Sequence, residues 1–239
     1  MKIKLPSEIA YLLAILILSF AVAMLTAADF GISMIVAPAY LLSLKTGFLS
    51  FGQAEYVIQA GIFVLLCLLL RRFRVVYLTS FLTCLIYGAV LDLWRRIPFF
   101  NPQITAPGSM PTGARIPMFI VGMLLTSVSV ALFYKVYLYP QVYDFFVKGV
   151  SEKYRLNRSV FKTVFDLICL AAATAMTFAF FGEWKGIGWG TLIMAVFNGT
   201  LIGLFCRFFD AHFEILPLFP KFAARFDLEE TSETIHTAT

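Results

Sequence analysis

The sequence predicts an all-α integral membrane protein with two internal repeats, six long transmembrane helices and two short or re-entrant segments. Of its 239 residues, 60% are hydrophobic and only 14% are charged, against about 45–50% and about 25% in an ordinary soluble domain. The mean hydropathy is +0.86. Several apolar runs are long enough to cross a hydrocarbon core about 30 Å thick as helices. None of them shows the alternating pattern of a membrane β-barrel strand.

The charged residues and the cysteines exclude several functional classes. The net charge is +5, but the Lys and Arg residues stand in small groups between apolar runs, as orientation signals do, so we expect no nucleic-acid binding. The four cysteines lie inside apolar runs without CxxC spacing, which indicates packing rather than a metal site or a disulfide. The sequence has no phosphate-binding loop, GxSxG or HExxH motif, so we expect neither an enzyme nor a cofactor.

The first membrane repeat is expected over residues 1–97. Asp29 follows the first apolar run and is well placed to cap the segment after it. That segment contains Pro38 and is short for a span, so it is either a half-helix, a re-entrant segment or a tilted short span. The long helices are predicted at 9–28, 53–70 and 75–94, and the short segment at 32–44.

A linker rich in Pro and Gly is expected over residues 98–115, and it separates the two halves. The second membrane repeat follows over residues 116–210, with a short amphipathic segment at 141–149. Residues 211–239 form a polar C-terminal tail, whose end, 227–239, is expected to be disordered. The long helices of this half are predicted at 116–138, 160–181 and 189–208.

The two halves align with one another at two offsets. Six spans would make them inverted repeats, whereas eight spans, with the short segments crossing, would make them parallel. The positive-inside rule places both termini in the cytoplasm in either case and does not choose between them. The short, proline-broken segments favour six spans. Offset 107 places Ser50, Glu55 and Gln59 on Asn157, Lys162 and Asp166, and offset 111 places Tyr87 and Gly88 on Asn198 and Gly199.

Three glycine-rich stretches carry a resemblance to a known family. They are 28–33 (ADFGIS), the turn 46–52, and 186–191 (GIGWGT), which leads into Asn198 and Gly199. Over roughly residues 10–210 the chain resembles the YczE/YitT group of bacterial multi-pass membrane proteins, whose members look like two copies of one unit. The resemblance implies a location in the bacterial inner membrane, and it implies no particular activity.

Glu55, Lys162 and Asp166 are the strongest candidates for binding a substrate or an ion. They lie in the first two turns of long helices, at matching repeat positions, and ionisable groups at membrane depth usually face a cavity or a partner. Gln53 and Gln59 would add hydrogen bonds to a polar solute. The alternative is that these groups lie at the interface, with Lys162 and Asp166 forming an ordinary i,i+4 ion pair.

The remaining candidates are more ambiguous. Asp92 is either an ion ligand or an interface anchor beside Trp94, and Asp29 is either a ligand or a helix cap. Asn198, Gly199 and Gly203 form a spacing that allows helices to approach closely, either inside one chain or at the interface of a homodimer.

We therefore expect a secondary transporter or permease for a small polar or amphiphilic solute, with its site between the repeats. Paired short segments in two halves indicate such a site. Because no nucleotide motif occurs, transport would be coupled to an ion or a proton, carried by Glu55 or Asp166. The alternative is a scaffold or regulatory partner that acts through helix packing without transport. The expected partners are the lipid bilayer, a small solute and a second copy of the chain.

Overall fold

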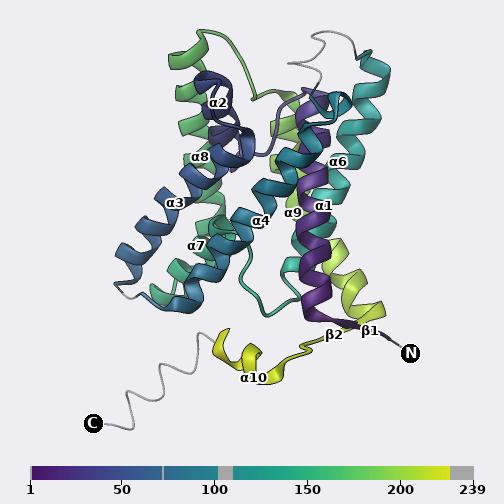
Figure 1. Ribbon diagram of the computed structural model, residues 1–239, viewed down its shortest axis with the longest axis vertical. Helices are drawn as coiled ribbons and strands as arrows, with labels where there is room; N and C mark the ends of the chain where they lie inside the picture. Colours follow the sequence, from purple (N-terminus) through teal and green to yellow (C-terminus); the bar gives the residue numbers. More distant parts are fainter. Residues whose placement is uncertain (1, 72, 102–109, 227–239) are drawn as a thin grey trace.

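Long helices that could span a membrane dominate the structure, a computed structural model that describes residues 2–71, 73–101 and 110–226 (Figure 1). Six of them are long and apolar enough to do so. The structure therefore confirms an all-helical protein of the membrane-spanning class. The six are α1 (Ser7–Ala28), α3 (Phe51–Leu70), α4 (Leu78–Arg95, preceded by the 3-10 turn Val75–Tyr77), α6 (Thr112–Phe133), α8 (Arg158–Phe181) and α9 (Trp189–His212).

The long helices of the two halves run in opposite directions. In Figure 1, α1 and α4 run upward from the end that holds the N-terminus, and α3 runs downward between them in sequence. In the second half α6 and α9 run downward and α8 runs upward. Each long helix of the first half thus runs opposite to the helix at the same place in the second half, as inverted repeats would require. The repeat itself stays a prediction.

Two short helices fill the positions where the sequence has short segments. They are α2 (Ala37–Thr46) and α7 (Val142–Lys153). At 1.5 Å per residue they are about 15 and 18 Å long, about half the thickness of the hydrocarbon core. In Figure 1, α2 lies near the top of the bundle and α7 near the bottom. The chain reaches each short helix from one end of the bundle and returns to the same end after it. The structure therefore follows the six-span arrangement.

Each short helix is attached to the opposite half by a lysine in its last turn. The Nζ of Lys45 in α2 donates to the carbonyl of Phe180 in α8 at 3.1 Å. The Nζ of Lys153 in α7 donates to the carbonyls of Leu69 and Leu70 in α3 at 2.9 and 2.6 Å. The last carbonyls of a helix lack intrahelical partners and attract cations. Lys45 and Lys153 are 108 positions apart, close to the offsets at which the two halves align.

The antiparallel pair α1 and α6 has the most extensive helix–helix contact in the described residues. Gly122 of α6 lies against Ala21 and Leu25 of α1, where a Cβ would be in close contact with both. The Oγ of Ser129 donates to the carbonyl of Ala14 at 2.6 Å. Small residues and hydroxyl groups at such an interface let two helices approach closely in lipid, where the hydrophobic effect gives little help.

Helices α3 and α4 also pack closely, and their contact depends on two glycines. A Cβ at Gly52 would overlap the carbonyl of Gly88, and a Cβ at Gly88 would overlap the ring of Tyr56. The corresponding helices of the second half, α8 and α9, share at most a weak contact over the described residues. The two halves therefore have similar elements but different packing at this position.

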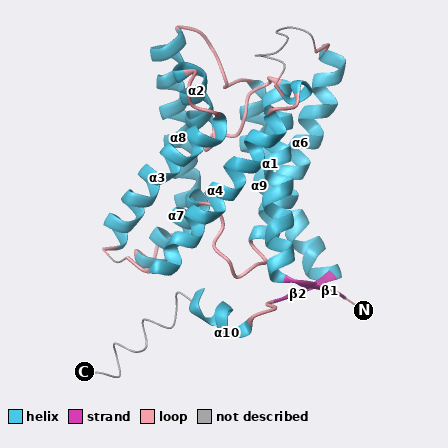
Figure 2. Ribbon diagram, in the orientation of Figure 1, coloured by secondary structure: helices cyan, strands magenta, loops and turns pink. Residues whose placement is uncertain are grey.

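The chain also forms a small sheet that the sequence does not predict. Strand β1 (Ile3–Pro6) pairs in parallel with β2 (Phe213–Leu216), and α10 (Pro220–Ala223) follows (Figure 2). This sheet ties the two ends of the bundle's sequence together below α1 and α9. The predicted tail thus has ordered structure as far as residue 226, and its polar end, 227–239, lies outside the described residues, as do residues 102–109 of the linker.

Several predicted boundaries are wrong. Helix α6 begins at Thr112, inside the predicted linker, and it ends at Phe133 because residues 134–141 leave the helix to reach the start of α7. Asp29 does not cap the following segment. It ends α1 in the left-handed conformation, with φ of 53°, and α2 begins only at Ala37.

We predict that Gly52→Ala destabilises the bundle, because its methyl group would overlap the backbone of α4. Overpacking of this kind costs about 1–3 kcal/mol, which would lower the melting temperature in detergent by several degrees. Gly61→Ala is the matched control in the same helix, since a Cβ there meets no described atom within 4 Å. Equal melting temperatures for the two variants would contradict this packing.

Candidate functional site

The side-chain amide of Gln59 joins α3 to the beginning of α7. Gln59 is completely buried. Its Oε1 accepts a hydrogen bond from the backbone N–H of Val142 at 3.1 Å. Its Nε2 donates to Glu55 Oε2 at 3.0 Å and to Gln141 Oε1 at 3.1 Å. Gln59 is the ninth residue of α3, about 12 Å along the helix axis, so α7 begins deep inside the bundle.

This contact fixes the orientation of two amides. A backbone N–H can only donate, so Gln59 must turn its oxygen toward Val142 and its nitrogen toward Gln141. Gln141 must then turn its oxygen toward Gln59, which leaves its Nε2 pointing away from the network. Among the described residues this Nε2 has no hydrogen-bond partner, although Gln141 is only 5% exposed.

Glu55 is buried in the same network without a cation. Its Oε2 accepts hydrogen bonds from Gln59 Nε2 and, at 3.0 Å, from the hydroxyl of Tyr143. Its Oε1 has no partner, and no ion pair to Glu55 occurs within the described parts of the chain. Burial of an unpaired charge is costly, so this environment favours the neutral acid.

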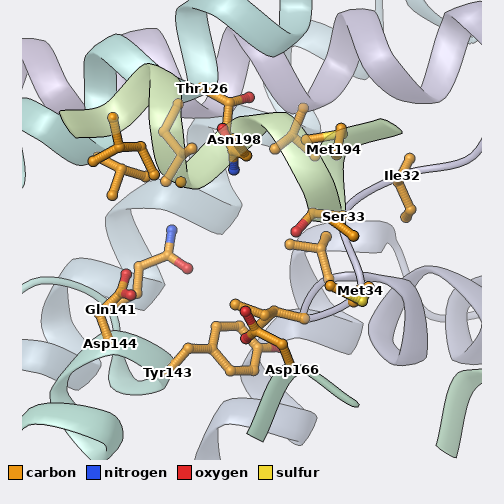
Figure 3. A pocket seen from close by; sticks show the side chains of 18 of the residues that line it. Ile32, Ser33, Met34, Thr126, Gln141, Tyr143, Asp144, Asp166, Met194 and Asn198 are labelled. Carbon is orange, nitrogen blue, oxygen red and sulfur yellow. The ribbon is translucent and has the colours of Figure 1, made fainter. Parts of the chain in front are cut away.

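A cavity of about 330 Å³ lies next to this network, between the two halves (Figure 3). From the first half it is lined by α1, by α4 and by residues 32–36, which lead into α2. From the second half it is lined by α6, α7, α8 and α9. Its walls are mostly apolar, and its main polar and charged side chains are Tyr87, Gln141, Asp144, Lys162, Asp166 and Asn198.

The structure places Lys162 and Asp166 at the cavity, and it places Glu55 behind it. Lys162 Nζ is 2.8 Å from Asp166 Oδ1, so the two form the i,i+4 ion pair that the sequence allowed. Tyr143 lines the cavity and donates to Glu55, which does not line the cavity itself. Tyr143 of α7 therefore connects Glu55 to the cavity that Lys162 and Asp166 line.

Asn198 connects α9 to α6 at the edge of the cavity. The Oγ of Ser127 donates to Asn198 Oδ1 at 2.6 Å. The neighbouring Gly199 lines the cavity. A Cβ at Gly199 or Gly203 would meet no described atom within 4 Å, so the predicted close packing at these glycines inside one chain is wrong. Glycines that do lie at close helix contacts include Gly52, Gly88 and Gly122; a dimer interface at Gly199 and Gly203 stays a prediction.

Gln53 and Asp92 cap the beginning of α3 and do not line the cavity. Gln53 Oε1 accepts from the backbone N–H of Ser50 at 2.9 Å, and the Oγ of Ser50 accepts from the backbone N–H of Gln53 at 3.1 Å. The two hydrogen bonds form a capping box. Asp92 of α4 accepts from the hydroxyl of Ser50 and, at 2.8 Å, from the backbone N–H of Gly52. A carboxylate at a helix N-terminus is stabilising in itself.

Asp29 also lies away from the main cavity. It forms an ion pair with Arg115 at 3.5 Å, and Arg115 donates to the carbonyls of Ala28 and Asp29 at 2.7 and 2.6 Å. Asp29 lines a second cavity, of about 460 Å³, formed with residues 183–189 at the top of the bundle in Figure 1. Five side chains have a buried polar atom without a partner among the described residues. Two of the five, Gln141 and Tyr87, line the first cavity and none lines the second, so we take the first as the candidate site.

Sequence reasoning missed Gln141, Tyr143 and Tyr87 as candidate site residues. Tyr87 lines the cavity from α4, is 1% exposed, and its hydroxyl has no partner among the described residues. A signal for it existed, because Tyr87 and Asn198 coincide at the offset of 111 residues. Gln141 also carried a signal, since it follows a Tyr-Pro break and directly precedes the short helix. The described residues contain no group of three or more His, Cys, Asp or Glu placed to hold a metal ion.

One comparison with known proteins gives a match. The model of a family of unknown function, DUF6198, matches residues 5–207. The chain belongs to this family. The matched region contains both halves and every residue that lines the cavity. No curated protein and no solved structure matches the chain. The family match does not test the resemblance to the YczE/YitT group, which stays a prediction.

We predict that Gln59→Leu releases the beginning of α7, because it leaves Val142 N–H and the oxygen of Gln141 without a partner and removes one of the two hydrogen bonds to Glu55. Buried groups left unpaired cost about 1–3 kcal/mol each, so amide hydrogen exchange in α7 should increase at least tenfold. Gln53→Leu, a control on the same helix, removes an exposed cap and should leave exchange in α7 unchanged. Slow exchange in α7 of the Gln59 variant would show that this network does not hold the helix.

Proposed function

We propose that this DUF6198 protein is a secondary transporter or permease for a small amphiphilic solute. The observation that carries the proposal is the position of the cavity. It lies between the two halves and is lined both by the residues that lead into α2 and by the first residues of α7. A site between repeats that is built from broken or short helices is typical of secondary transporters. A scaffold has no need of such a cavity.

The equivalent lysine contacts of the two short helices support inverted repeats. Each short helix is attached by its last-turn lysine to the C-terminal carbonyls of a long helix in the other half. The two contacts lie at opposite ends of the bundle in Figure 1. Inverted repeats can exchange conformations, and such an exchange opens a central site first to one side and then to the other.

The different packing of the two halves supports the same mechanism. Helices α3 and α4 pack closely at Gly52 and Gly88, whereas α8 and α9 both line the cavity and share at most a weak contact. We propose that in the alternative conformation α8 closes onto α9 and α3 separates from α4. The solute would then leave on the other side.

Glu55 is the proposed carrier of a coupled proton. It is buried without a cation, and Tyr143 connects it to the wall of the cavity. When the bundle opens on the side of α3 and α4, water would reach Glu55 and the acid could release its proton. The sequence contains no nucleotide-binding motif, so a proton gradient is the energy source that fits this chain, and we propose no enzymatic activity.

We propose a location in the bacterial cytoplasmic membrane, with both termini in the cytoplasm. Most Lys and Arg residues flank the end of the bundle that holds the N-terminus, including Lys2, Lys4, Arg71 and Lys153. The opposite end has fewer, among them Lys45 and Arg115. This asymmetry follows the positive-inside rule.

We predict that Glu55→Gln abolishes proton movement, because the amide keeps the shape of the side chain and cannot release a proton. The measurement uses proteoliposomes that contain a pH-sensitive dye, challenged with small amphiphilic acids, amines and alcohols. The wild-type protein should acidify or alkalinise the lumen with at least one of these solutes. Full proton movement in Glu55→Gln would contradict the coupling role, and no movement with any solute in the wild type would contradict coupled transport.

We also predict that Gly199→Leu blocks uptake whereas Gly203→Leu does not. Both glycines lie on α9 with open space around them, but only Gly199 lines the cavity. Leucine at 199 would fill part of the cavity, and uptake should fall at least tenfold. If both variants instead disrupt a complex between this protein and a partner to the same extent, helix packing at α9 would be the function. The scaffold alternative would then replace transport.

A further inference from the structure

The polar side chains of the cavity include more unpartnered hydrogen-bond donors than unpartnered acceptors. We propose that the cavity binds the carboxylate of a small monocarboxylate with an apolar body. This inference rests on the cavity proposed above as the transport site, and it names the class of solute. Its basis is that three hydrogen-bond donors at the cavity, in Gln141, Tyr87 and Asn198, have no partner among the described residues, whereas the carboxylates that line it have other roles.

Two of these donors are buried without a partner among the described residues. Gln59 fixes the oxygen of Gln141, so Gln141 Nε2 points away from that contact. Figure 3 shows the amide of Gln141 directed into the cavity. Tyr87 of α4 also lines the cavity, and its buried hydroxyl has no partner among the described residues. Buried polar groups in proteins are almost always hydrogen-bonded, so each of these two needs an explanation.

Asn198 supplies a third donor from the other side of the cavity. The hydroxyl of Ser127 lies 2.6 Å from its Oδ1 and 3.0 Å from the carbonyl of Met123, and its single proton serves one of the two. Figure 3 shows the nitrogen of Asn198 directed toward the cavity. Gln141, whose orientation follows from a backbone N–H, and Asn198 thus present amide nitrogens to the cavity from two different helices. This arrangement selects a ligand group rich in acceptors.

The carboxylates in the cavity do not call for a cationic solute. Asp166 is paired with Lys162 at 2.8 Å. Asp144 lies in the first turn of α7, where a negative charge offsets the helix dipole. A protonated amine has no acceptor, so it would leave the amide nitrogens of Gln141 and Asn198 unpartnered. A carboxylate accepts at about four lone-pair positions, which is enough for both amides and for the hydroxyl of Tyr87.

The backbone and the apolar walls agree with this class of solute. The residues before α2 line the cavity, so the positive end of that helix dipole lies beside it, whereas Asp144 already offsets the dipole of α7. Helix N-termini stabilise anions. Most of the remaining lining is apolar, including Leu18, Val22 and Met194. One polar group with an apolar body therefore fits better than a solute that is polar throughout.

The test measures binding to the purified full-length protein in lipid nanodiscs, with hexanoate, hexylammonium and 1-hexanol as probes. Hexanoate should bind, and the other two should bind at least tenfold more weakly. Tyr87→Phe should weaken hexanoate binding about ten- to hundredfold, since a hydrogen bond to a charged group is lost. It should not lower the stability of the ligand-free protein, because the hydroxyl it removes has no partner there.

Tyr56→Phe is the matched control, because its hydroxyl donates to the carbonyl of Leu85 at 2.9 Å and does not face the cavity. Binding of hexanoate should be unchanged in it. Equal losses in both variants, or tighter binding of the amine or alcohol, would overturn the inference. Hexanoate binding with this variant pattern but no flux in proteoliposomes would refute transport alone. Flux of a non-carboxylate solute that depends on Glu55, without hexanoate binding, would refute the carboxylate alone.

Discussion

The hydrogen bond from Val142 N–H to Gln59 is the contact on which the site depends. A backbone donor at the beginning of a helix has no intrahelical partner, and inside a lipid-embedded bundle water cannot supply one. Gln59 supplies it from α3, and in doing so it orients Gln141 and takes one oxygen of Glu55. The start of α7, the unpartnered donor at the cavity and the buried acid all follow from this one amide.

The proposed function develops from the same constraint. A short helix that begins in the middle of a bundle brings its positive end and its first side chains to membrane depth, where a solute can reach them. Helix α7 does this from one end of the bundle and α2 from the other, and each is attached to the opposite half by a lysine. The cavity between them therefore contacts elements that would move in opposite senses if the halves exchanged conformations.

The sequence was sufficient for the fold class, for the long helices and for the presence of two short segments, because hydrophobic run length is a direct consequence of membrane thickness. For Lys162 and Asp166 it left the i,i+4 ion pair as the alternative to a binding role, and the structure contains that pair because i,i+4 spacing is local. It could not separate Glu55 and Gln59, which join α7, from Gln53 and Asp92, which cap α3, because that difference depends on which helix packs alongside. Gly199 and Gly203 show the same limit: their spacing allows close packing, and in this fold the neighbouring helix lies elsewhere.

Site-specific cysteine labelling from each side of the membrane tests most directly whether α2 and α7 enter and leave on the same side. Single cysteines would be placed at Lys2, Gly47, Arg74 and Gly113 in a protein whose four native cysteines are replaced. Residues Lys2 and Arg74 should label from one side, and Gly47 and Gly113 from the other. If Lys2 instead labels from the same side as Gly47 and Gly113, the short helices cross the membrane, the halves are parallel, and the site between them as described here would not exist.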